Sequence, residues 1–388
     1  MRTINQAGSL SGKRVLVRND FNITIDENGK ILDDFRIRAS LPTIKYLLEN
    51  NAKIILMSHL GRPKGQVVEK LRLDPIAKRL TQLLEKPIKK LNNSVGKEVD
   101  EEISKIQNGE IILLENIQFN PGENKNDPEF AKILSGYGEI FIMDAFGQSH
   151  RDYASIIGIT KFIPGFAGLL LQKEVEVLAR ARENPERPLA VIIGGAKIST
   201  KIKLIKEFLA KADNIILGGA LANTVLHAQG LAVGKSIIEK DAIPEIKKLQ
   251  ITDTKLHIPL DAILSTEKSG KAPSRTGPIG RTGEDEMILD IGPETEQIFT
   301  SVIEKSKMII WNGPMGLFEV EQFTHGTKAI AESIIACPDC FSIVGGGETT
   351  CFLERIGLID KFDHVSTGGG AMMEFLAGDK LPGIEALK

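Results

Sequence analysis

The segment from Phe341 to Thr350, FSIVGGGETT, combines residue types that suit the binding of a phosphate group. Its apolar residues predict a buried strand, and three consecutive glycines permit a turn before a helical pattern begins. Free backbone N–H groups at a helix start attract phosphate, whereas Glu348 would repel it unless a cation such as Mg²⁺ lies between them. Thr349 adds a hydroxyl donor. The segment therefore predicts a phosphate site with a magnesium ion, the alternative being a tight turn with a chance acidic residue.

An apolar run followed by a glycine pair occurs twice more in the second half, at 191–195 and 215–219. Lys197 and Lys201 follow the first pair at a spacing of four, so both are expected to project the same way from the first turn of a helix. Two cations at the positive end of a helix cost stability unless a strongly anionic ligand binds there. We therefore predict that these lysines contact the ligand, with solvated lysines as the alternative.

Other motifs narrow the chemistry. The turn from Asn312 to Glu319 follows an apolar strand and ends in polar groups that can accept from ribose hydroxyls. No G-x-G-x-x-G occurs, which weakens a dinucleotide-dependent dehydrogenase, and the segment 230–236 has one residue too few for a Walker loop. There is no G-x-S-x-G elbow, so no covalent nucleophile is evident.

In the first half, apolar runs alternate with helical patterns, which predicts a parallel sheet covered on both faces. The predicted strands are 15–17, 54–57, 111–114 and 140–143, and the predicted helices are 39–50 and one that Asp74 and Pro75 cap. The carboxyl ends of parallel strands meet at one edge, where ligands bind in such folds.

Basic and polar residues follow all four strands and are expected to converge at this edge. A group of guanidinium ions suits a small ligand that carries carboxylate and phosphate groups, although a solvated surface charge is the alternative for any single residue. The residues concerned are Arg18, Asp20, Asn22, Arg36, Arg38, His59, Arg62, Glu115, Asn116, Gln118, Asp144, His150 and Arg151.

Length and composition indicate a two-domain protein. The chain has 388 residues, of which 42% are hydrophobic and 26% charged, and its net charge of −2 does not suggest a nucleic-acid or membrane partner. The start lacks the apolar core of a signal peptide, which predicts a cytoplasmic location.

Three cysteines cannot form a disulfide framework, and the C-x-x-C at Cys337 and Cys340 has no second pair to complete a zinc site. The pattern from 168 to 184 predicts one long helix, either a connector between domains or a further core helix.

These features together indicate direct phosphoryl transfer across a cleft that closes about the long helix. Basic groups on one half would hold an acid, and glycine turns with two lysines on the other half would hold a nucleotide. Such a reaction requires in-line positioning, charge neutralisation and exclusion of water.

The sequence resembles the phosphoglycerate kinase family from about residue 14 to residue 387. The most specific motifs are RNDFN (18–22), RIRASLPTI (36–44), SHLGRPKG (58–65), DAFG (144–147), GGAKIS (194–199), WNGPMGLFE (311–319), GGGET (345–349) and STGGGA (366–371). The resemblance implies an α/β fold of two Rossmann-like parallel-sheet domains joined by a long helix. It implies an N-terminal 3-phosphoglycerate domain at 1–167, on which a tail at about 375–388 packs back, and a nucleotide domain at 168–388 that includes the linking helix.

The resemblance also implies a reaction and its site. ATP and 3-phosphoglycerate would be converted reversibly to ADP and 1,3-bisphosphoglycerate by a cytoplasmic, monomeric enzyme that uses Mg²⁺. Arg36, Lys201 and Lys197 would be catalytic. The acid would contact Asp20, Phe21, Asn22, Arg36, His59, Leu60, Gly61, Arg62, Gln118 and Arg151. The nucleotide would contact Lys197, Lys201, Asn312, Glu319, Gly346, Gly347, Glu348 and Thr349, with Glu348 as the metal ligand.

The chain departs from the family pattern within this expected site. Gln118 stands where the family has a substrate-binding arginine, and Glu348 stands where it usually has a metal-binding aspartate. Thr200 replaces an aspartate, Met143 an asparagine, Tyr153 a histidine and Thr24 a proline. These departures leave an alternative open: a non-catalytic or substrate-shifted relative that binds nucleotide.

Overall fold

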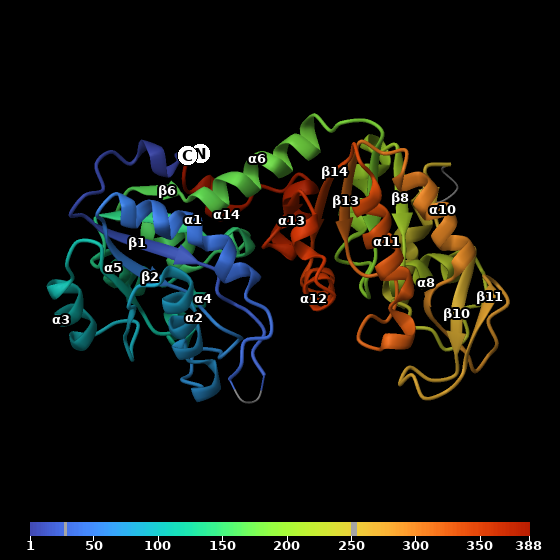
Figure 1. The fold of residues 1–388 in the computed structure, drawn as a ribbon, viewed down its shortest axis with the longest axis horizontal. Helices are drawn as coiled ribbons and strands as arrows, with labels where there is room; N and C mark the ends of the chain where they lie inside the picture. The colour runs from blue at the N-terminus through green and yellow to red at the C-terminus, as the bar shows by residue number, and fades with distance from the viewer. Residues whose placement is uncertain (27–28, 250–253) are drawn as a thin grey trace. The chain divides into compact units, whose positions relative to one another are not determined.

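The computed structural model describes residues 1–26, 29–249 and 254–388, which form two compact units. Unit 1 comprises Met1–Val177 and Asp379–Lys388, and unit 2 comprises Leu178–Gly378. The division falls inside the helix α6 (Leu169–Glu183), which therefore contributes residues to both units (Figure 1). Both units contain a parallel sheet with helices, so the predicted α/β class is confirmed.

Unit 1 contains a six-stranded parallel sheet in the order β3-β4-β2-β1-β5-β6. Its strands are β1 (Arg14–Asn19), β2 (Lys53–Met57), β3 (Lys89–Lys90), β4 (Ile111–Leu113), β5 (Ile140–Asp144) and β6 (Gly165–Ala167). Val15 and Val17 pack into one core cluster, while Leu16, between them on the opposite face, is equally buried. Burial on both faces explains why the strands appear in the sequence as continuous apolar runs.

The helices of unit 1 supply the other side of this core. They are α1 (Phe35–Glu49), α2 (Asp74–Leu84), α3 (Lys97–Lys105), α4 (Pro121–Asn124), α5 (Pro128–Ser135) and α14 (Pro382–Glu385). Short 3₁₀ turns lie at Ile4–Gln6, Glu69–Leu71, Ile117–Phe119, Phe146–Gln148 and Ile159–Lys161, with a π turn at Ala154–Gly158. The two chain ends lie side by side (Figure 1), and the Arg2 amide donates to the Leu387 carbonyl over 2.8 Å.

Unit 2 contains a second six-stranded parallel sheet, in the order β15-β14-β13-β7-β8-β9. Its strands are β7 (Leu189–Ile193), β8 (Asn214–Leu217), β9 (Leu256–His257), β13 (Met308–Asn312), β14 (Phe341–Gly345) and β15 (His364–Val365). The central pair, β7 and β13, is fully buried. The chain builds outward in opposite directions from this pair, which makes it a topological switch point.

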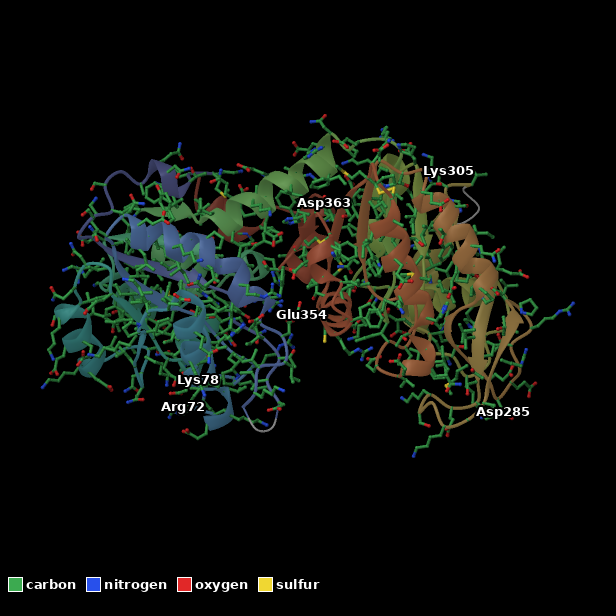
Figure 2. All side chains as sticks on the ribbon, in the orientation of Figure 1. Arg72, Lys78, Asp285, Lys305, Glu354 and Asp363 are labelled. Carbon is green, nitrogen blue, oxygen red and sulfur yellow. A yellow bond between two sulfur atoms is a disulfide. The ribbon has the colours of Figure 1, made fainter. Side chains whose placement is uncertain are left out.

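A three-stranded antiparallel sheet, β11-β10-β12, completes unit 2. Its strands are β10 (Asp261–Ser265), β11 (Ser274–Pro278) and β12 (Met287–Ile291). Sequence analysis missed it because β11, SRTGP, is a polar, mostly exposed edge strand with no apolar alternation. Figure 2 shows Asp285, in the turn between β11 and β12, at the periphery of the unit.

The helices of unit 2 follow the strands closely. They are α7 (Ile202–Lys211), α8 (Gly219–Ala228), α9 (Ile243–Lys247), α10 (Pro293–Ile303), α11 (His325–Ala336), α12 (Gly347–Arg355) and α13 (Gly369–Leu376). Further 3₁₀ turns lie at Lys240–Ala242, Glu321–Phe323 and Ile359–Lys361. In the part of the chain that the structure describes, no helix combines the length and apolarity that a membrane span requires.

The structure corrects two local predictions in unit 1. The helix predicted from residue 39 begins at Phe35, so it includes Arg36 in its first turn, and it continues through Pro42. Asp74 is the first residue of α2 and not its cap, because Leu73 occupies the cap position.

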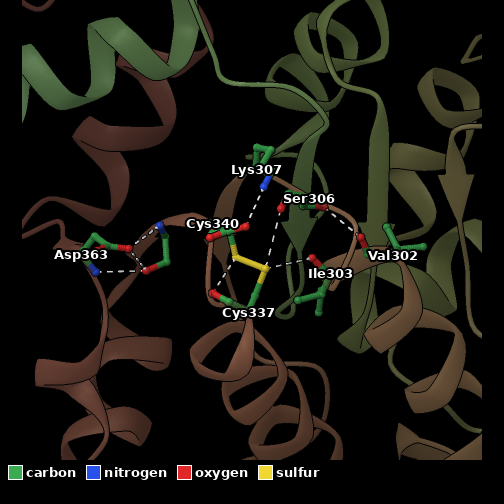
Figure 3. The surroundings of a disulfide bond; sticks show 9 residues. Val302, Ile303, Ser306, Lys307, Cys337, Cys340 and Asp363 are labelled. Carbon is green, nitrogen blue, oxygen red and sulfur yellow. Dashed lines mark hydrogen bonds and ion pairs between the residues drawn. A yellow bond between two sulfur atoms is a disulfide. The ribbon is translucent and has the colours of Figure 1, made fainter.

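The structure pairs the two cysteines of the C-x-x-C, which sequence analysis left without a role. Cys337 and Cys340 form a disulfide at the end of α11, just before β14 (Figure 3). Nearby, the Ser342 amide and hydroxyl donate to Asp363, over 2.8 and 2.7 Å. These contacts tie down the amino end of β14, the strand that leads into the glycine segment.

Candidate active site

A cavity of about 480 Å³ lies in unit 2 beyond the carboxyl ends of β7, β8 and β13. This is the switch-point position where open parallel sheets bind ligands. Its wall includes apolar side chains, which suit a flat ring, and two exposed carboxylates, Glu319 and Glu348. The lining residues that decide the argument are Gly195, Gly219, Leu289, Pro314, Phe318 and Lys235.

Glycine is required where the loops of this cavity cross. A Cβ added to Gly194 would lie 2.1 Å from the Pro314 carbonyl oxygen. Gly219 has a φ of +63°, and a Cβ there would lie 2.7 Å from the Gly195 nitrogen. The glycine pairs after β7 and β8 therefore allow two backbones to approach each other at the cavity wall.

Lys201 is the cation that the structure places at this switch point. Its ammonium donates to the Gly194 carbonyl over 2.6 Å and to the Asn312 carbonyl over 3.5 Å. It lies near Glu348, and its side chain is buried. Burial lowers the pKa of Lys201 to about 8, an effect that Glu348 only partly opposes. A desolvated cation held by main-chain carbonyls is preorganised to interact with an anion.

The predicted pairing of Lys197 with Lys201 on one helix turn is wrong. The helix α7 begins only at Ile202, so Lys201 is its cap residue and Lys197 lies in the preceding loop. Lys197 is exposed whereas Lys201 is buried. The periodicity failed because the loop after β7 folds back over Gly313 and Pro314 before the helix starts.

The glycine segment has the predicted form of strand, turn and helix. Gly346, with a φ of +103°, caps α12, and Gly347 and Glu348 are exposed in its first turn. Asn312 donates its side-chain amide to the Gly345 carbonyl over 3.1 Å. Thr349 is fully buried, and its hydroxyl accepts from the Gly313 amide over 2.8 Å. Asn312 and Thr349 therefore hold the loops after β13 and β14 together, and Glu348 is the exposed polar side chain of the turn.

The donor set at this turn suits a magnesium ion that arrives with a nucleotide. Among residues 1–26, 29–249 and 254–388, no three His, Cys, Asp or Glu side chains cluster as a metal site. Mg²⁺ commonly binds through one or two carboxylates together with phosphate oxygens and water. Glu348 is exposed at the cavity wall and can be that carboxylate.

In unit 1, several predicted residues meet at the carboxyl end of β1. The Arg36 guanidinium donates to the Asn22 carbonyl over 2.6 Å and lies 3.5 Å from the Asp20 carboxylate. The Asn22 side chain accepts from the Gly61 amide over 2.8 Å. His59 is buried, with Nδ1 3.9 Å from Asp20. We call Asp20, Asn22, Arg36, His59 and Gly61 the acid cluster; it joins the loops after β1 and β2 to the first turn of α1.

The electrostatics of the acid cluster favour a bound anion. Burial raises the pKa of Asp20, but Arg36 and other basic neighbours outweigh burial and hold that pKa below its ordinary value. Burial lowers the pKa of His59 to about 3 and, together with Arg151, that of His150 to about 4. Both imidazoles are therefore neutral near pH 7, and the arginines supply the positive charge.

The other predicted acid-site residues differ in their placement. Phe21 and Leu60 are buried core side chains, so only their backbones can face a ligand. Gln118 is also buried and lies in a 3₁₀ turn. Its main-chain carbonyl accepts from the Gly65 amide over 3.1 Å. Arg62 and Arg151 are exposed. Within the described residues, no hydrogen bond or ion pair ties Arg62 to the acid cluster.

Sequence reasoning missed several residues that the fold brings to these sites. Ser58 accepts from the Phe21 amide over 2.8 Å, and Gln148 donates to Asp20 over 3.3 Å. Lys235 lines the cavity from the segment interpreted as an ordinary loop. The glycine pair before α8, which sequence analysis singled out, lies at a further wall of the cavity.

One parallel sheet has a cavity at its switch point, and the other has an arginine-containing anion site at the carboxyl end of β1. This combination is the one expected of a phosphotransferase that acts on small anionic molecules. The family model for phosphoglycerate kinase matches residues 4–379. The chain belongs to the phosphoglycerate kinase family, as the sequence motifs predicted, and is a glycolytic kinase. A non-catalytic or substrate-shifted relative is not favoured.

Curated relatives and solved structures agree with this assignment. The phosphoglycerate kinase of Dictyoglomus turgidum is 49% identical over 383 residues, which cover 98% of this chain and 96% of that protein. The phosphoglycerate kinase of Moorella thermoacetica is 47% identical over 382 residues, with 97% of each covered. The structure of the enzyme from Coxiella burnetii has a TM-score of 0.84 at 38% identity, covering 99% of this chain and 98% of that one. The structure of the enzyme from Pyrococcus horikoshii OT3 has a TM-score of 0.89 at 30% identity, covering 100% of this chain and 98% of that one.

Proposed function

We propose that the chain transfers a phosphoryl group reversibly between ATP and the carboxylate of 3-phosphoglycerate, giving ADP and 1,3-bisphosphoglycerate. The observation that carries the proposal is the buried Lys201, whose ammonium donates to two main-chain carbonyls close to Gly195, a residue that lines the cavity. The carboxylate attacks the γ-phosphorus as the bond to the β,γ-bridging oxygen breaks, so no enzyme nucleophile is needed. Direct transfer requires the two bound substrates to meet during the reaction.

Residues of unit 1 would hold the acid. Arg36 is placed by Asn22 and Asp20 and would present its guanidinium to the carboxylate and the transferring group. Asp20 and Asn22 would fix the hydroxyl group and the loop, and neutral His59 would donate a hydrogen bond. Arg62, Gln118 and Arg151, with the backbones of Phe21, Leu60 and Gly61, would surround the remaining phosphate.

Residues of unit 2 would hold the nucleotide. The apolar wall of the cavity would take the base, and Glu319 would accept from the ribose hydroxyls. The phosphates would lie at the start of α12, on the amides of Gly346 and Gly347 and against Lys201, with Lys197 closing over them. Asn312 and Thr349 would support this loop through the bonds described above. Glu348 would ligate Mg²⁺, and the ion would supply positive charge to neutralise the phosphates.

A coupled assay tests the reaction directly. ATP, Mg²⁺ and 3-phosphoglycerate are mixed with the protein, and the acyl phosphate is detected through a dehydrogenase that consumes it. Formation of 1,3-bisphosphoglycerate supports the proposal, and binding of both substrates without turnover would refute it. We also propose that the protein is a cytoplasmic monomer without nucleic-acid or membrane partners, consistent with its balanced charge. Light scattering measures the mass of the protein in solution, and a mass equal to that of one protomer would support the monomer.

Gln118→Arg is expected to tighten binding of 3-phosphoglycerate by about 1 to 3 kcal/mol, the range for a hydrogen bond to a charged group. The physical reason is that glutamine offers a neutral amide where a guanidinium could form a charge-assisted contact. Isothermal titration of the acid measures the change. Gln118→Lys is the matched control, since it restores charge without the forked geometry. Unchanged or weaker affinity in Gln118→Arg would show that the pocket is built around glutamine.

Nucleotide binding is expected to weaken above about pH 8, because the pKa of Lys201 is lowered to about 8 and its cation is lost as the pH rises through that value. Below this pH the ammonium is charged and can attract phosphate. The dissociation constant of ADP, measured from about pH 6.5 to 9.5, should rise on the alkaline side. In Lys201→Arg the guanidinium stays charged, so the rise should disappear. A flat wild-type profile would contradict the role of Lys201.

A further inference from the structure

Arg18 is a fully buried arginine that the proposed reaction does not use. It is the fifth residue of β1, and its guanidinium contacts His59 of the acid cluster. Its side chain is 0% exposed, so it cannot touch a bound substrate in this structure. A buried guanidinium requires partners for its donors, and the identity of those partners indicates what it does.

Each nitrogen of Arg18 has an identified acceptor. Nε donates to the Ser155 hydroxyl over 2.9 Å, and one terminal nitrogen donates to the Asn19 carbonyl. The other terminal nitrogen lies 3.3 Å from Nδ1 of His59. A guanidinium has no lone pair to offer, so Nδ1 of His59 must be the acceptor. The proton of this neutral imidazole is therefore on Nε2.

A second buried contact holds Arg18 in place. The Ser155 hydroxyl has one proton, which it donates to the Glu123 carboxylate over 2.6 Å, while the Ser155 amide donates to the same carboxylate over 3.0 Å. Glu123 is fully buried. Donation thus runs in one direction, from Arg18 to Ser155 to Glu123. Burial raises the pKa of the Glu123 carboxyl, while Arg18 and the two bonds from Ser155 oppose that rise.

The surroundings of His59 agree with a neutral ring. Burial lowers its pKa to about 3; Asp20 opposes this effect, whereas Arg18, Arg36 and Arg151 reinforce it. Asp20 lies 3.9 Å from Nδ1, beyond hydrogen-bond distance, so it does not compete with Arg18 for that nitrogen. Within residues 1–26, 29–249 and 254–388, the structure gives Nε2 of His59 no protein partner.

We infer that Arg18 is a positioning residue that fixes His59 as the Nε2–H tautomer, so that this histidine donates to the anionic substrate at every working pH. The inference rests on the proposed binding of 3-phosphoglycerate to the acid cluster. The Glu123–Ser155 pair keeps Arg18 aligned, and Arg18 acts on the substrate only through His59. Without this alignment the imidazole could take its other tautomer, whose lone pair on Nε2 would repel an oxyanion.

Nitrogen-15 NMR of the histidine rings tests the tautomer in the full-length protein without ligand. His59→Gln identifies the signal. The wild-type His59 is expected to show an unprotonated Nδ1 and a protonated Nε2, with no titration from about pH 5 to 9. The lysine of Arg18→Lys cannot donate to Ser155 and His59 at the same time. In this variant and in Ser155→Ala we expect mixed tautomers of His59 or a titration of its ring within this range. A wild-type ring with a proton on Nδ1 would overturn the inference.

Kinetics supply the second readout. Ser155→Ala is expected to raise KM for 3-phosphoglycerate about tenfold, the size of one hydrogen bond, and to leave KM for ATP within about twofold. Ser40→Ala is the matched control, since Ser40 is a buried serine of unit 1 whose hydroxyl donates to the Ile37 carbonyl over 2.8 Å. Wild-type KM values and a wild-type His59 spectrum in Ser155→Ala would overturn the inference while leaving the proposed function intact. Absence of turnover in the wild type would refute the proposed function, and the spectra would still decide the tautomer.

Discussion

Lys201→Ala is expected to lower kcat by about 10²- to 10³-fold, the range measured when one preorganised charge at a reacting centre is removed. The ammonium of Lys201 is already desolvated and oriented by the Gly194 and Asn312 carbonyls, so little reorganisation is needed when charge develops on the transferring group. KM for ATP is expected to change less than kcat, because the stabilisation is largest in the transition state. The coupled assay under saturating substrates measures both parameters.

Lys206→Ala is the matched control for this prediction. Lys206 lies on the same helix, α7, is exposed, and pairs with Glu245 over 3.0 Å on the surface. Its loss should leave kcat within about twofold, since exposed ion pairs contribute little. Lys201→Met, which keeps much of the packing of the side chain, separates lost charge from lost stability. Near wild-type turnover in Lys201→Met would exclude Lys201 as the charge-stabilising group.

Arg36→Ala is expected to lower kcat by about a hundredfold and to weaken 3-phosphoglycerate binding as well. The guanidinium of Arg36 is held by the Asn22 carbonyl and the Asp20 carboxylate at the first turn of α1, where it would meet the acid and the transferring phosphoryl group. Arg36→Lys should recover only part of the activity, because an ammonium lacks the planar fork. Stopped-flow measurement of a single turnover would separate the chemical step from binding.

The control for Arg36 lies two positions further along α1. Arg38 donates to Asp34 over 2.8 Å and is a partly exposed surface residue. Arg38→Ala should therefore leave both kcat and the affinity for the acid near their wild-type values. Equal losses in Arg36→Ala and Arg38→Ala would point to damage of the helix and not to a role of Arg36 in transfer.

Much of unit 1 could be predicted from its apolar runs. Val15, Leu16 and Val17 lie in a strand buried on both faces, which produces an unbroken apolar run bounded by polar residues. The edge strands β3 and β6 could not be predicted this way, because they are two and three residues long and take their conformation from a neighbouring strand. Likewise, α1 could be predicted as a helix, but its start, and hence the place of Arg36 on it, could not.

The site was predictable by residue type but not by geometry. The spacing of Lys197 and Lys201 is compatible with one helix turn, yet the structure buries Lys201 and exposes Lys197. Periodicity reports local conformation only, and here the loop after β7 is bonded to residues that follow β13, more than a hundred positions later. The buried hydrogen bonds from Arg18 to Ser155 and from Ser155 to Glu123 could not be predicted from the sequence either, since Arg18 and Ser155 are 137 positions apart.

The sequence by itself determined the α/β class, the central strands, the glycine turn before α12 and the family, because each is encoded in consecutive residues. Only the tertiary structure decided which lysine is desolvated, which nitrogen of His59 can donate, and which strands' loops line the cavity. These properties depend on burial and on contacts between distant segments, and a linear pattern carries no information about the dielectric environment or the partner that a side chain will find.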